Sequence, residues 1–516
     1  MKLACRLGLL ALAVGLSAAL PQPGSAQQIR DPDAAKAYQD GVQLLQEKKY
    51  ADAVAALNAA IAKDPSWSEP YVAKGEALKG IEDYQSAIKV YTTALDLSQN
   101  SAAAFNGRGE CLMEATPPQL DLAFNDFQTA LNLDRNNAKT LSNIGHLLVN
   151  SSGAGQDPSA ALRYLDDAIT LDDKDARAFR DRGLAHTRLG EFKEAVADVQ
   201  QAGQIDPADY ENFSTLATIH LYQDEFEPAI ASISKAIDVY KPKKRTDPKI
   251  FIEGLLMRAD ARQRLGAKLD DEAERKQLYQ ASVEDADAIL VEYKDRAPQN
   301  GIAYYRRGLA LRLLEQYSKA VDSLTSAIQA VEQTQDPGYL ADAFLKRGIC
   351  YHYMGSEELA RGDFQQASAT GSGFNDPRVS LWIGFTYHLQ GDYREAIKWY
   401  STAIAKNPNF TLAHSNRARA YLDLKDYNKA VASFYDAIRT EPNVGEHYYN
   451  AGFALAKDEQ YQKAVEFFEL ALLKEKPQPR MYRGAAEALR KLGRNDLADK
   501  YDRQAAAAEA KMQATK

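Results

Sequence analysis

The chain has 516 residues and an acidic balance, with 63 Lys and Arg against 71 Asp and Glu and a formal net charge of -8. An acidic surface argues against general binding to nucleic acid or to anionic lipid. A chain of this length would ordinarily contain three or four globular domains, unless it is a repeat array, in which length reflects the number of repeats.

The first 26 residues differ from the rest of the chain. Lys2 and Arg6 form a basic start, residues 7–20 are almost wholly apolar, and the stretch ends in small residues at Ala26. This order is typical of a secretory signal peptide, and the apolar run is short for a membrane span. We expect cleavage near Ala26 and export to the periplasm or the extracellular space, without stable membrane insertion afterwards. The alternative is an uncleaved anchor.

From residue 34 onward the chain repeats a spacing of about 34 residues. Apolar residues recur three and four apart on both sides of a polar break, which predicts two amphipathic helices joined by a short turn. Each predicted helix contains one small residue of a pair. The twelve pairs are Gly41 with Ala53, Gly75 with Ala87, Gly109 with Ala123, Gly145 with Ala161, Gly183 with Ala195, Ala217 with Ala229, Ala259 with Ala281, Gly308 with Ala320, Gly348 with Ala360, Gly384 with Ala396, Ala418 with Ala430, and Gly452 with Ala464. We expect them where two antiparallel helices cross closely.

Aromatic and proline residues follow the same period. An aromatic residue opens the second predicted helix in eight units, at Tyr50, Tyr84, Phe192, Phe226, Tyr317, Tyr393, Tyr427 and Tyr461. Prolines fall just past the second helix at Pro65, Pro207, Pro408 and Pro442. A proline ring cannot donate a backbone hydrogen bond, so it ends one helix and begins the link to the next.

This order of small, aromatic and proline residues over 34 positions resembles the tetratricopeptide repeat family, across most of residues 34–477. The resemblance implies an all-α solenoid of about twelve helix-turn-helix repeats that form a right-handed superhelix. It also implies that the first helices line a concave groove, which the family uses to bind peptides or other proteins.

The repeats are interrupted in the middle of the chain. The basic, proline-bracketed run from Lys241 to Pro248 predicts a link between an amino-terminal block of six repeats (residues 34–243) and a carboxy-terminal block of six (residues 244–478). The first three repeats of the second block carry insertions, including ten extra residues in the charged, helix-prone run from Lys268 to Leu278. We expect residues 479–516 to form capping helices followed by a frayed alanine-rich tail from Ala505.

No pattern indicates catalysis, a metal site or a cofactor. The seven histidines are scattered, the glycines form no phosphate-binding loop, and the serines lack the context of a nucleophile. Cys111 and Cys350 lie in distant repeats and are predicted to be buried free thiols. We therefore predict that the chain is not an enzyme.

By analogy with the family, the groove side chains lie on the first helix of each unit, opposite the small packing residues. An arginine between aromatic and aliphatic residues is typical of a binding hot spot. The alternative is that these side chains only pack on the neighbouring first helix. The candidates are Arg177, Arg180 and Leu184 in the unit that opens at Ala176, and Leu381, Phe385, His388, Ser415, Arg419, Leu422, Tyr449 and Phe453 in the last three units.

One family device, a clamp of two Lys or Arg and two Asn that grips a terminal carboxylate, is incomplete in this chain. Asn143 and Arg177 occupy matching places, but the preceding unit has Asn106 and Glu110, and Asp181 stands where a cation is needed. Because Glu110 would repel a carboxylate, we expect no binding of this kind.

Together these features predict a monomeric, non-enzymatic scaffold that binds a peptide segment or a partner protein, and no nucleic acid. The alternative is an accessory subunit of a cell-envelope assembly, for polymer export or outer-membrane protein handling, which positions a separate enzyme.

Overall fold

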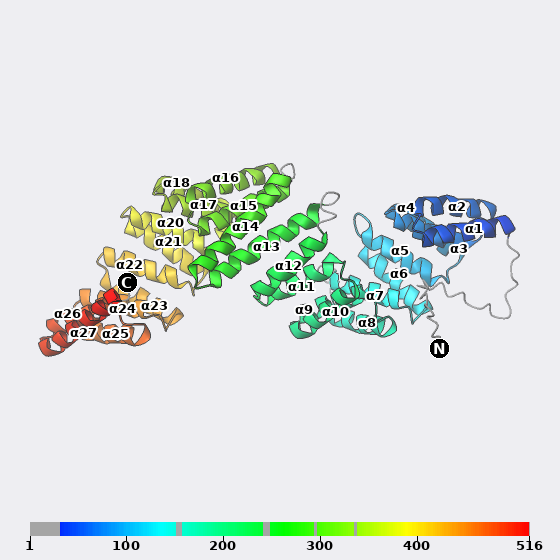
Figure 1. Cartoon of the computed structure of the whole chain (residues 1–516). Helices are drawn as coiled ribbons and strands as arrows, with labels where there is room; N and C mark the ends of the chain where they lie inside the picture. Colours follow the sequence, from blue (N-terminus) through cyan, green and yellow to red (C-terminus); the bar gives the residue numbers. More distant parts are fainter. Residues whose placement is uncertain (1–30, 151–156, 241–247, 294–296, 335–337, 515–516) are drawn as a thin grey trace, which may run out of the picture. The chain divides into compact units, whose positions relative to one another are not determined.

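The computed structural model describes residues 31–150, 157–240, 248–293, 297–334 and 338–514. These residues form 27 helices and no strand, so the predicted all-α fold is confirmed. Apart from the four-residue α19, the described helices follow one another as thirteen pairs (Figure 1). The predicted signal peptide and the link at 241–247 lie outside the described residues.

The chain divides into two compact units, residues 1–207 and 208–516. The first unit contains α1 (Pro32–Gln46), α2 (Tyr50–Lys63), α3 (Ser68–Gly80), α4 (Tyr84–Leu97), α5 (Ala102–Glu114), α6 (Leu120–Leu133), α7 (Ala138–Asn150), α8 (Pro158–Leu171), α9 (Ala176–Leu189) and α10 (Phe192–Ile205).

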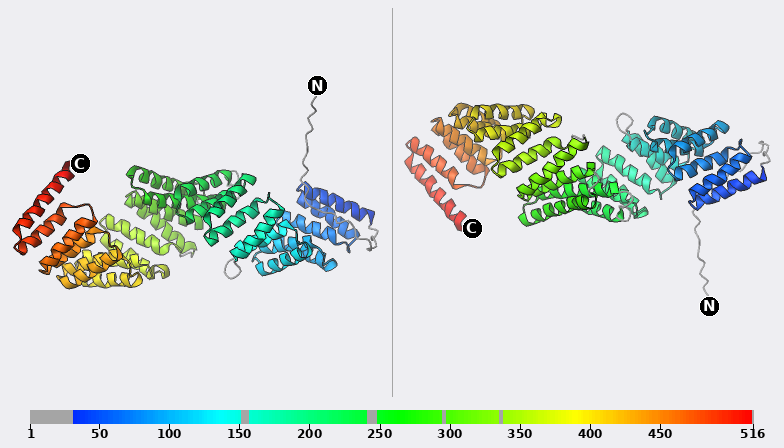
Figure 2. Two further views of the ribbon diagram at one scale, coloured as in Figure 1. Left: turned by 90° about the horizontal axis from the view of Figure 1, so that it is seen from below. Right: turned by 90° about the horizontal axis from the view of Figure 1, so that it is seen from above.

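The second unit holds the remaining helices, and both views in Figure 2 show the last of them stacked in sequence order. They are α11 (Tyr210–Tyr222), α12 (Phe226–Tyr240), α13 (Pro248–Lys268), α14 (Glu272–Glu292), α15 (Ala297–Leu313), α16 (Tyr317–Thr334), α17 (Leu340–Tyr353), α18 (Glu357–Ala369), α19 (Gly371–Phe374), α20 (Pro377–Leu389), α21 (Tyr393–Lys406), α22 (Thr411–Asp423), α23 (Tyr427–Thr440), α24 (Gly445–Lys457), α25 (Tyr461–Lys474), α26 (Pro479–Lys491) and α27 (Asn495–Ala514).

The division between the units falls one repeat before the predicted block boundary at 243/244. On either side of that predicted boundary, α12 and α13 share one hydrophobic cluster, which includes Ile233, Phe251 and Leu255. The described residues that flank the link therefore pack within a single unit.

The turn inside each repeat explains where the second helices begin. All eight aromatic residues predicted to open a second helix are the first residue of one. Two positions before each aromatic the backbone has a positive φ, as at Gly391, where φ is 78° and which precedes Tyr393. The amide of Asp392 then donates to the carbonyl of Tyr387 at 3.0 Å, which closes the end of the first helix.

The small residues lie where the two helices of a repeat cross. A Cβ atom added to Gly384 would lie 2.8 Å from ring carbons of Tyr400 and 3.1 Å from the carbonyl oxygen of Ala396. Both Ala396 and Tyr400 are fully buried. Gly384 thus leaves room for the side chain of Tyr400, which lies one helical turn after Ala396 in the second helix. The same contact joins Gly41 with Leu57, Gly75 with Tyr91, Gly109 with Phe127, Gly145 with Leu165, Gly308 with Leu324, Gly348 with Phe364, and Gly452 with Phe468.

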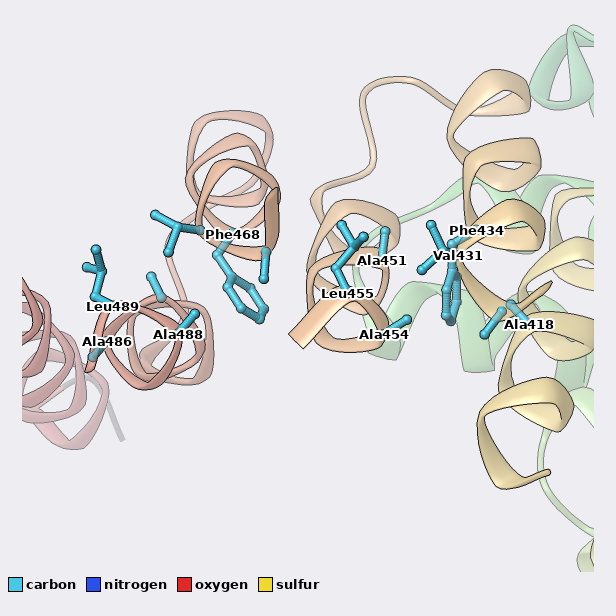
Figure 3. Close-up of a cluster of buried hydrophobic side chains, with 14 of the residues drawn as sticks. Ala418, Val431, Phe434, Ala451, Ala454, Leu455, Phe468, Ala486, Ala488 and Leu489 are labelled. Atoms are coloured by element: carbon cyan, nitrogen blue, oxygen red, sulfur yellow. The ribbon is translucent and has the colours of Figure 1, made fainter. Parts of the chain in front are cut away.

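These large side chains form the core of the array. In Figure 3 the rings of Phe434 and Phe468 lie among alanines of the neighbouring helices in the last repeats. Phe468 also contacts the next repeat, because a Cβ on Gly484 would lie 2.8 Å from its ring.

The insertion predicted at 268–278 forms no separate loop. It lengthens α13 and α14, each of which has 21 residues. The predicted partner of Ala259 was wrong by one position, since the fully buried Ser282 donates from its hydroxyl to the carbonyl of Ala259 at 3.0 Å while Ala281 is half-buried. The added residues shift the helical phase, and a serine whose hydroxyl is satisfied can then replace alanine at the crossing.

The end of the chain forms a further helix pair, α26 and α27, which packs on α25 through Met481, Ala485 and Leu489. The expected fraying from Ala505 is not observed. α27 continues to Ala514, and Ala505 is buried.

A second repeated interaction, absent from the sequence prediction, joins neighbouring second helices. In six repeats an arginine stands directly before the small residue of the first helix: Arg108, Arg182, Arg258, Arg307, Arg347 and Arg417. Arg347 donates to both carboxylate oxygens of Asp363 in α18, at 2.8 and 2.7 Å, and to the hydroxyl of Thr325 in α16 at 3.0 Å. Arg108 bridges Asp126 and Thr92 in the same way. Five of these arginines therefore link successive repeats, whereas Arg417 bonds to Ser433 and Asp436 of its own second helix, α23.

Enlarging the small residue at a crossing should destabilise the array. Ala396→Leu must displace the Tyr400 ring or the backbone of α20, and overpacking of this kind costs about 1–3 kcal/mol. Urea unfolding measures the change, with Thr402→Leu as the control because Thr402 is exposed on the same helix. A neutral Ala396→Leu would place the helix crossing elsewhere.

Removing the acceptor of an arginine bridge should also be costly. Asp363→Ala leaves the partly buried guanidinium of Arg347 without its carboxylate, and loss of one partner from such a pair costs about 2–4 kcal/mol. Glu358→Ala removes the same charge from an exposed position of α18 and serves as the control. Thermal denaturation of the two variants in parallel gives the comparison, and equal melting temperatures would contradict a structural role for the bridge.

Candidate partner-binding face

The structure separates the predicted groove residues by their position in the repeat. Arg180, Leu381 and Ser415, three residues before the small residue, are only 7%, 5% and 5% exposed. Leu381 belongs to a hydrophobic cluster that includes Ala413 and Ala420 of the next first helix. Side chains at this position pack between first helices, so these three are corrected from groove-lining to interior residues.

Arg177 contacts its own chain. Its guanidinium donates to the side-chain oxygen of Asn143 on the preceding first helix. Leu184, in the same helix α9, is partly buried against the hydrophobic cluster of α5 to α9.

Around Asn143, the carboxylate of Glu110 occupies the middle of a polar network in the first unit. Its oxygens accept from Lys79 at 2.6 Å, Lys139 at 2.9 Å, Asn143 at 2.8 Å and Asn106 at 3.0 Å. The lysine and asparagine groups that an incoming carboxylate would need are therefore already bonded to a carboxylate of the chain itself.

The pKa of Glu110 reflects this cage. Burial alone would raise the pKa, but the ammonium groups of Lys139 and Lys79 outweigh burial and lower it to about 2. The Lys79 ammonium is correspondingly held in its charged form, with a raised pKa. Glu110 is thus ionised at neutral pH and attracts the surrounding cations.

The next charged residue on this face also has its hydrogen-bond partner within the chain. The buried Asp181 accepts from the imidazole of His146 at 2.9 Å. The first helices α5, α7 and α9 therefore present a polar network whose charges largely neutralise one another.

The second unit presents a different surface. An open cavity of about 470 Å³ is lined by His388, Arg419, Leu422, Asp423, Lys425, Tyr427, Phe453 and Lys457. These residues come from α20, α22, α24, the first residue of α23, and the turn between α22 and α23. The cavity brings together four of the predicted residues, His388, Arg419, Leu422 and Phe453.

The cavity is rich in cations. Within the described part of the chain, Arg419, Lys425 and Lys457 belong to no ion pair within 4.0 Å, whereas Asp423 is bound by the imidazole of His388 at 2.7 Å. The one carboxylate of the lining is thus occupied, and three positive groups face the cavity.

An apolar surface lies beside these cations. The ring of Phe453 is 41% exposed, and the ammonium of Lys457 stands 5.2 Å from its centroid. Leu422 adds a half-buried aliphatic side chain. The arrangement can hold an anionic group and an apolar side chain next to each other.

The last two predicted residues lie outside this cavity. Phe385 packs edge-on against His352 and Trp382, with centroids 5.2 and 5.5 Å apart. The guanidinium carbon of Arg480 lies over the ring of Tyr449, 5.0 Å from the ring centroid.

Sequence reasoning missed Lys425 and Lys457. Lys457 stands five residues after Gly452, as Asp423 does after Ala418, so the position five after the small residue also faces the cavity. Lys425 lies in the turn, at the positive-φ position before Tyr427. Extending the periodic assignment by one more helical position would have found Lys457.

The described residues contain no group of three or more His, Cys, Asp or Glu side chains that could hold a metal ion. Cys111 and Cys350 are buried free thiols, as predicted. Burial raises the pKa of Cys111 to about 12 and that of Cys350 to about 11, so both are unreactive thiols at neutral pH. No described helix is both long enough and apolar enough to span a bilayer.

Comparisons with known proteins find tetratricopeptide repeats in several parts of the chain. The family described as "Tetratricopeptide repeat" matches residues 72–138, 147–210 and 415–478, and the family described as "TPR repeat" matches residues 384–425.

The curated relatives are distant. Superkiller protein 3 of Schizosaccharomyces pombe is 23% identical over 39% of this chain and 15% of its own length. DnaJ homolog subfamily C member 3 of Homo sapiens is 23% identical over 41% of this chain and 44% of its own. Tetratricopeptide repeat protein 16 of Homo sapiens is 24% identical over 74% of this chain and 44% of its own length. The chain spans less than half the length of each of these relatives.

Two solved structures illustrate the structural similarity. Yeast Tom70 aligns with 93% of this chain and 99% of its own, at 15% identity and a TM-score of 0.38. YrrB, described as a TPR protein with an unusual peptide-binding site, aligns with 38% of this chain and 96% of its own, at 24% identity and a TM-score of 0.30.

The Glu110 network predicts a defined pH dependence. Because the folded-state pKa is lowered to about 2, the stabilisation is present above the ordinary glutamate pKa and is lost as the pH falls from about 4.5 towards 2. Glu110→Gln should lower the free energy of unfolding at pH 7 by about 3 kcal/mol. It should also flatten the dependence of stability on pH between 5 and 2.

Glu114→Gln, at an exposed position of the same helix, is the matched control for this measurement. Urea unfolding at several pH values separates the two variants. If both followed the same pH profile as the original chain, the network would contribute nothing to stability.

Proposed function

Since the chain carries tetratricopeptide repeats, we propose that it is a non-enzymatic scaffold that holds an extended segment of a partner protein on the first helices of its second unit. The observation that carries this proposal is the cavity lined from three consecutive first helices, α20, α22 and α24. A surface built from successive repeats suits an elongated ligand.

The size of the cavity sets the length of the segment. Packed helices lie about 8–10 Å apart, so three first helices span about 20 Å. An extended chain covers about 3.3–3.6 Å per residue, which corresponds to about six residues. Such a segment would gain affinity from several modest contacts on a surface that needs little rearrangement.

The first unit is the less suitable surface. Its donors around Glu110 are bonded within the chain, and a ligand would have to displace these bonds before it gained any. In the second unit, Arg419 and Phe453 are exposed, and a ligand can contact them without breaking an ion pair.

Export belongs to the same proposal. The basic, apolar and small-residue order of residues 1–26 supports a signal peptide that is removed near Ala26. Mass spectrometry of the chain from its producing cell should then find an amino terminus at Gln27 in the fraction outside the cytoplasm. An intact Met1 in that fraction would indicate the uncleaved anchor, and a chain found only in the cytoplasm would count against export.

In-cell photo-crosslinking tests the binding role. A photoreactive residue replacing Phe453 should capture one recurring partner protein, identified by mass spectrometry, because this side chain is exposed in the cavity.

Tyr435 is the matched control position, since its side chain is also 41% exposed but lies on the second helix α23. Capture at 453 and not at 435 supports the proposal. Equal capture at both positions, or none at 453, contradicts it.

A further inference from the structure

We infer that the segment held in the cavity of the second unit is acidic and carries an apolar side chain between its carboxylates. This inference rests on the proposed function and specifies the chemistry of its ligand. Three cations, one bound carboxylate and one exposed aromatic ring line the same cavity.

The charge of the lining is opposite to that of the chain. Acidic residues exceed basic ones over the whole sequence, 71 against 63, yet Arg419, Lys425 and Lys457 gather around one cavity. Like charges placed together repel one another, and the described residues supply no ion pair within 4.0 Å to relieve them. Carboxylates of a ligand would provide that relief and would also form charge-assisted hydrogen bonds.

The hydrogen bond that Asp423 accepts also favours a negatively charged ligand. Its carboxylate is the single acidic group of the lining, and it accepts from the imidazole of His388 at 2.7 Å. This contact reduces the repulsion that an approaching anion would meet. The first unit shows the contrasting arrangement, in which Glu110 already neutralises the cations of its face.

The apolar requirement comes from Phe453 and Leu422. The Phe453 ring is 41% exposed and stands beside the Lys457 ammonium, so an aliphatic or aromatic side chain could cover the ring while a carboxylate reached the ammonium. Large, partly exposed aromatic residues are common anchors at interfaces. A segment with acidic residues alone would leave this ring in water.

A protein segment fits this lining better than a nucleic acid. Nucleic acid carries a phosphate at each nucleotide and favours an extended basic surface, whereas this cavity has three cations and a carboxylate on an acidic chain. Nucleic-acid binding is therefore one of the outcomes that would overturn the inference.

Fluorescence anisotropy with two labelled peptides tests the chemistry on the full chain without residues 1–26. One peptide has eight residues, with glutamates on both sides of a central phenylalanine, and the other has glutamine in place of every glutamate. The acidic peptide should bind at least tenfold more tightly than the glutamine peptide at 50 mM salt, and raising the salt should reduce the difference.

Charge reversal in the chain locates the contact. Arg419→Glu and Lys457→Glu should each weaken binding of the acidic peptide at least tenfold. Lys463→Glu changes the net charge equally on the exposed face of α25 and should leave binding unchanged. Unfolding curves of the three variants confirm that each remains folded.

The inference is overturned if the two peptides bind equally, if neither binds, or if Lys463→Glu weakens binding as much as Arg419→Glu does. Tighter binding of a single-stranded oligonucleotide at the same residues would also overturn it. The crosslinking experiment at Phe453 separates this result from the proposed function. A captured partner whose crosslinked segment is not acidic would leave the scaffold role standing and refute only the chemistry.

Discussion

The contact between a small residue of each first helix and a large side chain of its paired second helix sets the geometry of the array. At Gly384 a single added methyl group would strike the ring of Tyr400, so the two helices can approach closely only because glycine is present. The same arrangement recurs from repeat to repeat, and it gives successive first helices the same rotation about their axes. Positions one, four and five residues after the small residue then face the same side in each repeat. Packing in the interior thereby decides which side chains a partner can reach.

The arginine bridges complement this contact on the side of the second helices. Arg347 holds Asp363 of its own repeat and Thr325 of the preceding one, so one side chain links two repeats. A repeat protein buries its core only between neighbours, and interactions that cross from one repeat to the next supply much of its stability. Hydrogen bonds are directional, whereas apolar contacts are not. The Arg347 bridge therefore helps to hold α16 and α18 at a fixed distance on either side of one first helix, α17.

The two units use the same repeat for different electrostatic purposes. In the first unit, Glu110 is surrounded by Lys79 and Lys139, and the network closes on itself. In the second, Arg419 and Lys457 stand on corresponding first helices, and no carboxylate among the described residues lies within 4.0 Å to pair with them. A closed network stabilises the fold, whereas an open cluster of cations favours a ligand that brings negative charge. The contrast arises from a few substitutions on one helical face, while the interior pattern is retained.

The sequence by itself determined the helix pairs, the turn positions and the buried small residues, because these follow from periodic local patterns that each repeat restates. It was sufficient to locate every second helix that an aromatic residue opens, such as the one that begins at Tyr393. Only the tertiary structure decided the partner of Ala259, since an insertion shifts the helical phase by an amount that spacing does not reveal. It alone also separated Leu381, which neighbouring first helices enclose, from Arg419, which they leave exposed. Both side chains lie on the same helical face in the sequence pattern. Their difference depends on how far each helix is covered by the next, and that is a property of packing between repeats.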